Sequence, residues 1–279
     1  MYCDACKYSF LVVYSCKKRG ICPSCSAKRS VLFAKHLYEH VVKGTRLRHI
    51  VFTIPKRLRS YLRYHRSVGD ELFEAAWGSI KEVLGSNAGV PAVVLTLATA
   101  GEALNFHPHL HGSLADGLFS PQGSFTPFKI IDQARLEHRF SERVLAGLLE
   151  RGLIDDGVVS QILSQEHSGF SVWLGEAFED QESSRFVARY IERGPISLEK
   201  LSIQDDIVTY TAKDGTAHEF DALEFLALLS THIAKPYESL TRYYGFYQLD
   251  GPGSAPQKAP GCFLGRSLPA SEKRLWCHQ

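Results

Sequence analysis

Apolar residues recur along this chain with two spacings, which separate the expected helices from the expected strands. Residues 26–42 and 70–84 carry apolar side chains three and four positions apart, a spacing typical of amphipathic helices. Residues 48–54 and 92–99 are short runs rich in β-branched residues, which predicts strands. Residues 201–220 contain two turn sequences between apolar runs, so we expect a β-meander there.

The second half of the chain adds helices and an acidic stretch. Residues 132–184 hold 11 acidic residues against four Arg, so this part should repel a polyanion. We expect a long helix over 132–151, followed by an acidic, linker-like helical insert that continues to 182. A further helix over 183–193 begins at a Ser cap, and an apolar helix is expected over 221–232. Residues 242–247 should form a last strand or loop, and disorder is expected from 250 onward.

Three histidines stand at alternate positions in the stretch that follows the second predicted strand. Side chains alternate between the two faces of a strand, so His107, His109 and His111 should point the same way, near Asn105. Pro108 cannot donate to a sheet ladder, which places His107 near the start of the strand. Imidazoles grouped in this way are typical of a divalent metal site. The alternative is that they are polar residues on a solvated face with no ligand.

The cysteines cluster at the N-terminus, where five of the seven lie within the first 25 residues. Cys3, Cys6, Cys22 and Cys25 form two CxxC pairs with the spacing of a zinc ribbon. Four thiolates leave no open position on the metal, so this zinc should be structural. Cys16 lies between the pairs, and the pattern leaves open whether it replaces one of the four.

Charge is distributed unevenly, although the net charge is only +2. Residues 1–66 contain 15 Lys and Arg against two acidic residues, and such a basic segment indicates a polyanionic partner, most simply nucleic acid. Residues 56–66 also carry two Tyr, which suits either single-stranded DNA or a packed helix with a basic outer face. The candidate DNA-binding residues in this part are Lys17, Lys18, Arg19, Lys28, Arg29, Lys56 and Arg57.

The predicted helix over 183–193 contains Tyr190 next to Arg189, with Phe186 one turn earlier. A tyrosine hydroxyl can attack a phosphodiester, form a covalent phosphotyrosine and leave a free 3′-OH. Because the ordinary pKa of Tyr is about 10, the hydroxyl needs a metal or a cation such as Arg189 to help it ionise. A core tyrosine is the structural alternative, and Tyr243 and Tyr244 are competing nucleophiles.

Five ordered motifs between about residues 2 and 248 resemble one family. They are the CxxC pairs with SCKKRGICPSC, HIVFTIPKRLR, LNFHPHLHG, ARYIERGPIS and RYYG. Together they resemble the rolling-circle insertion-sequence transposases of the HUH (His-hydrophobic-His) endonuclease superfamily, of the insertion sequence ninety-one type. Phe186 stands where many relatives have a second tyrosine, as in the single-tyrosine common-region subgroup.

The resemblance implies an α+β fold, in which an N-terminal zinc ribbon precedes a catalytic domain with a central antiparallel sheet flanked by helices. It implies His109 and His111 as the metal pair, His107 as the best third ligand, Tyr190 as the nucleophile, Mg or Mn as the catalytic metal, and single-stranded DNA as the substrate. The expected division is 1–44 for the zinc module, 45–249 for the catalytic domain with its insert, and 250–279 for the tail.

The composition predicts a cytoplasmic protein, and the resemblance implies that it is associated with the bacterial nucleoid. The chain is 44% hydrophobic and 22% charged, shows no membrane-spanning apolar run and begins without a signal peptide pattern. Two rival functions stay open: a replication initiator or relaxase with the same chemistry, and a zinc-ribbon remnant that binds DNA without cutting it. The sequence does not determine the oligomeric state.

Overall fold

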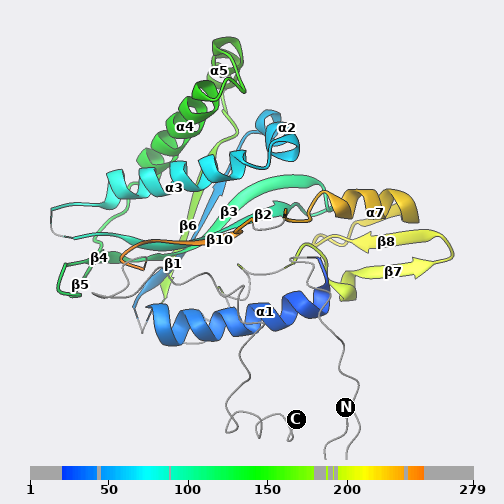
Figure 1. The fold of residues 1–279 in the computed structure, drawn as a ribbon, viewed down its shortest axis with the longest axis horizontal. Coiled ribbons are helices and arrows are strands. Elements are labelled where there is room, and N and C mark those ends of the chain that lie inside the picture. The colour runs from blue at the N-terminus through cyan, green and yellow to red at the C-terminus, as the bar shows by residue number, and fades with distance from the viewer. Residues whose placement is uncertain are drawn as a thin grey trace, which may run out of the picture.

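A five-stranded antiparallel sheet with the order β10-β2-β3-β1-β6 lies at the centre of the molecule (Figure 1). The structure is a computed structural model and describes residues 21–247 apart from 43–44, 88, 179–186, 188–190, 192–193 and 236–237. The strands are β1 (Leu47–Thr53), β2 (Ala92–Ala100), β3 (Phe106–Ala115), β6 (Ser171–Phe178) and β10 (Thr241–Gly245). The histidine strand β3 is therefore the middle strand.

Helices cover the sheet from both sides. Figure 1 shows α2 (Lys56–Tyr64), α3 (Val68–Leu84) and α4 (Gln133–Glu150) on one side and α1 (Pro23–His36) on the other. A π-helical segment, η1 (Leu37–Val42), continues α1. The mixture of helices with an antiparallel sheet confirms the α+β fold class. Residues 56–64 form a helix in which Leu58 and Leu62 are buried and Lys56 and Arg57 are exposed. This segment is therefore a packed helix with a basic outer face.

Alternation along the strands gives the sheet two different faces. Even-numbered residues of β1 and β3, such as Ile50, Phe52 and Leu110, belong to the main core beneath α2, α3 and α4. The odd-numbered residues of the same strands face the other way and include the three histidines of β3. At one end this second face is covered by a smaller cluster that joins α1 and η1 to the sheet, consisting of Phe33, Ala34, Leu37, Val42, Leu47, Val94, Val187 and Ile191.

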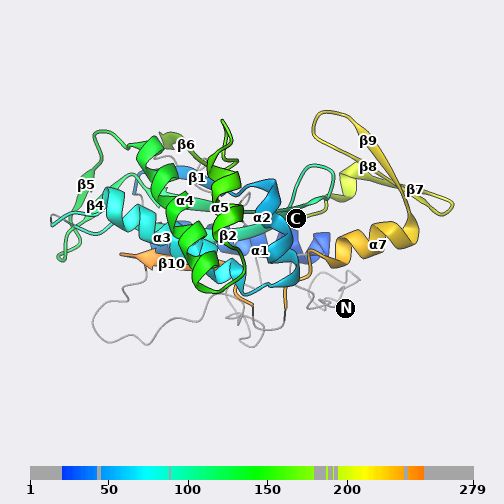
Figure 2. The ribbon, with the colours of Figure 1, turned by 90° about the horizontal axis from the view of Figure 1, so that it is seen from above.

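A smaller unit extends from one end of the sheet (Figure 2). It contains η2 (Leu198–Lys200), the antiparallel strands β7 (Leu201–Gln204), β8 (Ile207–Thr211) and β9 (Ala217–Asp221), and α7 (Ala222–Ser230). The β-meander prediction is therefore confirmed. His232, just after α7, joins the unit to the end of β2 and to the β2–β3 connection, since its ring is hydrogen-bonded to Thr99 Oγ1 at 3.0 Å and to the Leu104 carbonyl at 2.8 Å.

One expectation for the acidic stretch was wrong. Helices α4 and α5 (Asp156–Leu163) confirm its first part, and Asp132 caps α4 by accepting a hydrogen bond from the Arg135 amide at 2.9 Å. Residues 171–178, however, form the strand β6 rather than helix. They pair with β1, and Val172 is buried in the main core, because β1 would otherwise leave its edge unpaired. The acidic stretch thus supplies the edge strand β6 of the central sheet and the helix α4 that packs on the main core.

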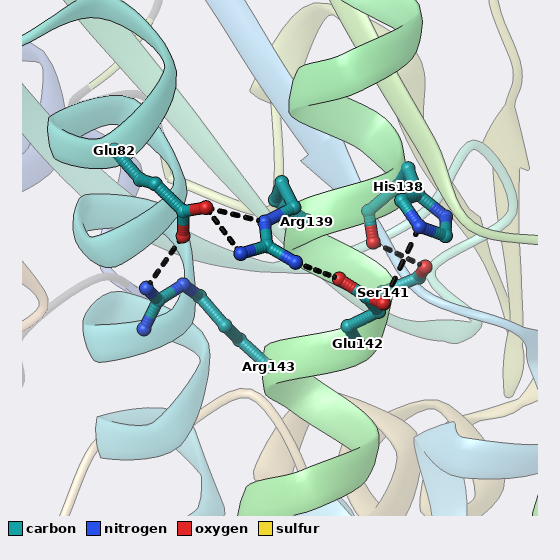
Figure 3. A network of polar contacts seen from close by, with 6 residues as sticks. All are labelled: Glu82, His138, Arg139, Ser141, Glu142 and Arg143. Carbon is teal, nitrogen blue, oxygen red and sulfur yellow. Dashed lines mark hydrogen bonds and ion pairs between the residues drawn. The ribbon is translucent and has the colours of Figure 1, made fainter.

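The helices α3 and α4 are also linked by a polar network at their surface (Figure 3). Glu82 of α3 accepts hydrogen bonds from Arg139 and Arg143 of α4, at 2.6 Å and 2.8 Å, and Arg139 also donates to Glu142. The hydrogen bonds from the two guanidinium groups lower the pKa of the Glu82 carboxyl. The network is exposed to solvent, so it orients the helices more than it stabilises them.

A buried ion cluster closes the end of the sheet opposite His107. The Asp116 carboxylate is fully buried and accepts hydrogen bonds from Arg48, at 2.5 Å, while Arg46 lies 3.1 Å away.

Asp116→Ala is expected to lower the free energy of unfolding by about 3 kcal/mol, because two arginines lose their buried counter-charge. Urea unfolding measures this change. The half-exposed Asp70, which pairs with Arg242, is the control: Asp70→Ala should cost less than about 1 kcal/mol. Equal effects would contradict the assignment.

The remaining short strands are β4 (Gly117–Phe119) and β5 (Phe125–Pro127), which form a hairpin after the histidine strand. The tail from 250 and the first 20 residues lie outside the described residues, so the expected disorder and the first half of the zinc ribbon stay predictions. Within the described ranges, no helix is long and apolar enough to cross a membrane.

Candidate active site

The histidine strand begins at a bulge and then runs through the middle of the sheet. His109 pairs with Thr53 of β1 and with Ala98 of β2, and His111 pairs with Val51 and Thr96. The register with β2 shifts between Ala98 and Ala100, beside Pro108, where a missing backbone donor is tolerated. This confirms the prediction that His107 lies near the start of the strand. His109 and His111 lie within the sheet.

Two of the three histidines form a close pair. The Nε2 atoms of His109 and His111 are 2.9 Å apart, and the ring centroids are 4.6 Å apart. His109 Nδ1 lies 2.6 Å from the His107 carbonyl oxygen, and His111 Nδ1 lies 3.1 Å from Nε2 of His49 on β1. The Nδ1 atom of each ring therefore has a hydrogen-bond partner, while the two Nε2 atoms point toward each other.

This hydrogen bonding suits a metal-ligand pair. A carbonyl oxygen only accepts, so His109 Nδ1 must donate, and its Nε2 then carries a lone pair. Metal-binding histidines are usually oriented in this way by a partner at the other ring nitrogen. The His107 carbonyl fills that role for His109, and the His49 ring fills it for His111. The arrangement therefore fits a divalent cation held through two imidazole nitrogens.

A complete set of three protein ligands is not formed within the described part of the chain. No group of three or more His, Cys, Asp or Glu side chains there is placed to hold a metal ion. The His107 ring lies 5.1 Å from the His109 ring, and its buried Nε2 atom has no hydrogen-bond partner among the described residues. An orphaned buried nitrogen needs a ligand or a partner. His107 thus stays the predicted third ligand. Only His109 and His111 are already placed as a pair in the candidate metal site.

The surroundings of these imidazoles favour their neutral form, which is the form that binds a metal. Burial, assisted by the charges of Arg59 and His109, lowers the pKa of His107 to about 4. Burial, assisted by His109, His49 and Lys213, lowers the pKa of His111 to about 3. The pKa of His109 is lowered by burial and by Arg59, while its hydrogen bond to the His107 carbonyl acts in the opposite direction.

Arg59 of α2 is a basic residue that acts on two of these histidines and that the sequence analysis did not select. Helix α2 starts three residues after Thr53, the partner of His109, and packs against β3. The Arg59 charge therefore acts on both His107 and His109. Its Nε atom is buried without a hydrogen-bond partner in the described structure, and burial lowers the pKa of its guanidinium group. A partly exposed guanidinium whose Nε donor is open is suited to bind an anion.

The predicted nucleophile helix can be followed only through two of its residues. Val187 and Ile191 are buried and helical, and they belong to the cluster with Val94 and Leu47 on the histidine side of the sheet. Tyr190 and Arg189 lie outside the described residues, so their roles stay predictions. Tyr244 is buried in the opposite, main-core face, where burial raises the pKa of its hydroxyl to about 12.

The other predicted residues lie in two places. Cys22 occupies the N-cap position of α1 and Cys25 lies in its first turn, where a helix N-terminus favours negatively charged thiolates. Lys28 is exposed and Arg29 partly exposed on the same helix, whereas Lys56 and Arg57 are exposed on the first turn of α2. Cys3, Cys6, Cys16, Lys17, Lys18 and Arg19 lie outside the described residues.

Comparison with known proteins now adds the family. A model described as "Putative transposase" matches residues 92–254, a range that contains β3 and its histidines. This chain belongs to that transposase family. The model of the IS91-type "Transposase zinc-binding domain" matches residues 1–54, which include all four predicted zinc ligands. The N-terminal region of the transposase is therefore a zinc-binding domain, and DNA is the partner that family membership implies.

Two curated relatives agree with the family. "Putative transposase y4qJ" of Sinorhizobium fredii is 26% identical over 311 aligned positions, covering 96% of this transposase and 74% of the relative. The "Transposase for insertion sequence element IS801" of Pseudomonas savastanoi pv. phaseolicola is 23% identical, over 81% of this chain and 60% of its own length. No solved structure matches significantly.

Two residues near the histidines were missed by sequence reasoning. His49 was treated only as part of a predicted strand, and Arg59 was one of several basic residues in segment 56–66. A signal for His49 was available, because residues 49, 51 and 53 share one face of their strand. Nothing local marks Arg59, since its proximity to His107 depends on how α2 packs against β3.

Proposed function

We propose that this transposase nicks and transfers single-stranded DNA through a covalent 5′-phosphotyrosine on Tyr190, in rolling-circle transposition. The convergent pair His109–His111 on the middle strand carries this proposal. Its support comes from three surrounding features: the neutral imidazoles, the cation Arg59 beside them, and the packing of Val187 and Ile191 on the histidine side of the sheet.

The proposed reaction is an in-line displacement at one phosphodiester. The Tyr190 oxygen attacks phosphorus and the tyrosine loses its proton, while the 3′-oxygen leaves and takes up a proton to become a free 3′-OH. The bond energy is kept in the phosphotyrosine, so a later 3′-OH can reverse the step and join the strand without ATP. A bound Mg²⁺ or Mn²⁺ would supply charge stabilisation on the phosphoryl oxygens.

The side chains of this chain have separate roles in the proposal. His109 and His111, with His107 as the third ligand, hold the metal, and His49 orients His111 through the 3.1 Å contact to its Nδ1. Arg59 donates to a non-bridging phosphate oxygen and orients the scissile group. Arg189 assists ionisation of Tyr190. The zinc-binding domain, through Lys17, Lys18, Arg19, Lys28 and Arg29, contacts the DNA backbone.

A suicide-substrate assay tests the function. A labelled single-stranded hairpin is incubated with the full, zinc-loaded protein and Mn²⁺, and the products are denatured. We expect a covalent protein–DNA adduct that forms on single-stranded but not duplex DNA. Binding without any adduct would favour the DNA-binding remnant instead. Cleavage of a plasmid origin in preference to transposon ends would favour a replication initiator or relaxase.

The role of Arg59 predicts a specific kinetic defect. Arg59→Gln should slow adduct formation by about 10-fold or more, since one charge-assisted contact to the phosphate is lost, whereas Arg59→Lys should recover part of the rate. Single-turnover adduct formation measures both. Arg63→Gln is the matched control, because Arg63 is exposed one turn later on the same helix. If the Arg63 variant is slowed as much as the Arg59 variant, general charge rather than a specific contact explains the effect.

A further inference from the structure

The edge strand β6 presents one large aromatic ring to solvent on the histidine side of the sheet. Trp173 is 51% exposed, whereas its neighbour Val172 is fully buried in the main core. Trp173 pairs with Val51 of β1, which in turn pairs with His111 of β3. The three residues therefore form one row across the sheet, with Trp173 at its outer end.

Ring contacts connect Trp173 to the candidate metal pair through His49. The Trp173 ring meets the His49 ring edge-on, with centroids 5.4 Å apart. His49 stacks on His111 at 5.3 Å, and His111 meets His109 at 4.6 Å. The indole is thus the exposed end of a continuous row of rings that leads into the site.

The position of the indole is fixed by its own strand as well as by His49. A side-chain carbon added at Gly175 would lie 3.0 Å from the Trp173 ring and 3.5 Å from the His49 carbonyl oxygen. The ring therefore lies close to the Gly175 backbone, in a space that a larger residue would narrow. A ring that is held in place yet half exposed is suited to stack with a ligand at little cost in conformational entropy.

The charges around the row favour an anionic ligand that also carries aromatic rings. Arg59 acts on His107 and His109 at one end, and Lys213 acts on His111. Single-stranded DNA combines phosphates with unpaired bases, and bases stack on exposed aromatic side chains in proteins that bind single strands.

We propose that Trp173 is a stacking platform for an unpaired base next to the phosphate bound at His109 and His111. The inference rests on the proposed function and adds the reason for single-strand selectivity. A base in a duplex is already stacked between its neighbours and paired, so it cannot take this position without being extruded. Trp173 would therefore distinguish unpaired DNA from duplex DNA at the site itself.

Equilibrium binding with two matched probes tests the stacking contact. The probes are oligothymidylate and an abasic deoxyribose-phosphate oligomer of equal length and charge, and the protein is the full, zinc-loaded chain with Tyr190→Phe to prevent reaction. We expect Trp173→Leu to weaken oligothymidylate binding by about 5- to 100-fold and to leave abasic binding unchanged. Trp173→Phe should retain most of the affinity. An equal loss on both probes, or no loss on either, would overturn the proposal.

Tryptophan fluorescence gives an independent readout that does not depend on the leucine variant folding. Oligothymidylate should quench the emission of the protein, and Trp173→Phe should remove most of this quenching. Trp77→Phe is the matched control and should preserve it, because Trp77 stacks on Tyr244 at 5.5 Å against the opposite face of the sheet. Quenching that persists in Trp173→Phe would contradict the platform.

The outcome is separable from that of the proposed function. Base-dependent binding that requires Trp173 would support the platform even if no covalent adduct forms. An adduct that forms normally while Trp173→Leu binds both probes like the parent protein would support the transposase chemistry and reject the platform.

Discussion

Replacing Tyr190 with phenylalanine should abolish the covalent protein–DNA adduct, a loss of at least about 10³-fold in rate. The change removes only the attacking oxygen, so the fold and the binding of single-stranded DNA should be preserved. The loss of the adduct is measured on a labelled hairpin, and the preserved affinity is measured by equilibrium binding of the same DNA. Peptide mass mapping of the parent adduct should locate the DNA on the peptide that contains residue 190.

The competing tyrosines provide the controls for this experiment. Tyr243→Phe and Tyr244→Phe each remove one hydroxyl near the sheet. Both should leave adduct formation within a few-fold of the parent rate, because burial raises the pKa of Tyr244 and Tyr243 belongs to the cluster beside α1. An adduct that survives in Tyr190→Phe and disappears in one of these variants would reassign the nucleophile without changing the class of reaction.

Removing either histidine of the close pair is expected to have the second-largest effect. His109→Ala and His111→Ala should each lower the rate of adduct formation by about 10²- to 10³-fold, because one imidazole alone holds a divalent cation weakly. Both should also weaken Mn²⁺ binding, which titration calorimetry measures without DNA and independently of activity. His49→Ala should have a smaller effect of about 10-fold, since His49 orients His111 without itself being a proposed ligand.

His138 supplies a matched control for the loss of an imidazole. It lies on the surface of α4, where its ring is 68% exposed and pairs with Glu142, on the main-core side of the sheet. His138→Ala should therefore leave both Mn²⁺ binding and adduct formation unchanged. If His109→Ala binds Mn²⁺ as tightly as His138→Ala does, the metal is held elsewhere and the assignment of the pair is wrong.

Much of the local structure could be predicted because it depends on short-range patterns. The repeat of apolar residues over 70–84 predicted α3, and the turn sequences within 201–220 predicted the meander β7–β9. Alternation along residues 107–111 placed three imidazoles on one side of a strand. These predictions succeeded because the periods of helices and strands are fixed by backbone geometry, which is independent of the rest of the fold.

The prediction for residues 171–178 failed for a complementary reason. Acidic composition suggested a solvated helical insert, but the segment became the strand β6 because β1 offers an open edge and the main core takes up Val172. Local preference in such a short segment is weak compared with pairing and burial. The same packing brought Trp173 against His49, a contact that no spacing in the sequence could indicate.

By itself, the sequence determined the family, the two CxxC pairs of the zinc-binding domain and the alternation of histidines on one strand. Tertiary structure alone decided that this strand is the middle one, that His109 and His111 converge through Nε2, and that His49, Arg59 and Trp173 surround them. The physical reason is that motif spacing records neighbours along the backbone. Neighbours across a sheet or beneath a helix are selected by register and by burial, which involve the whole chain at once.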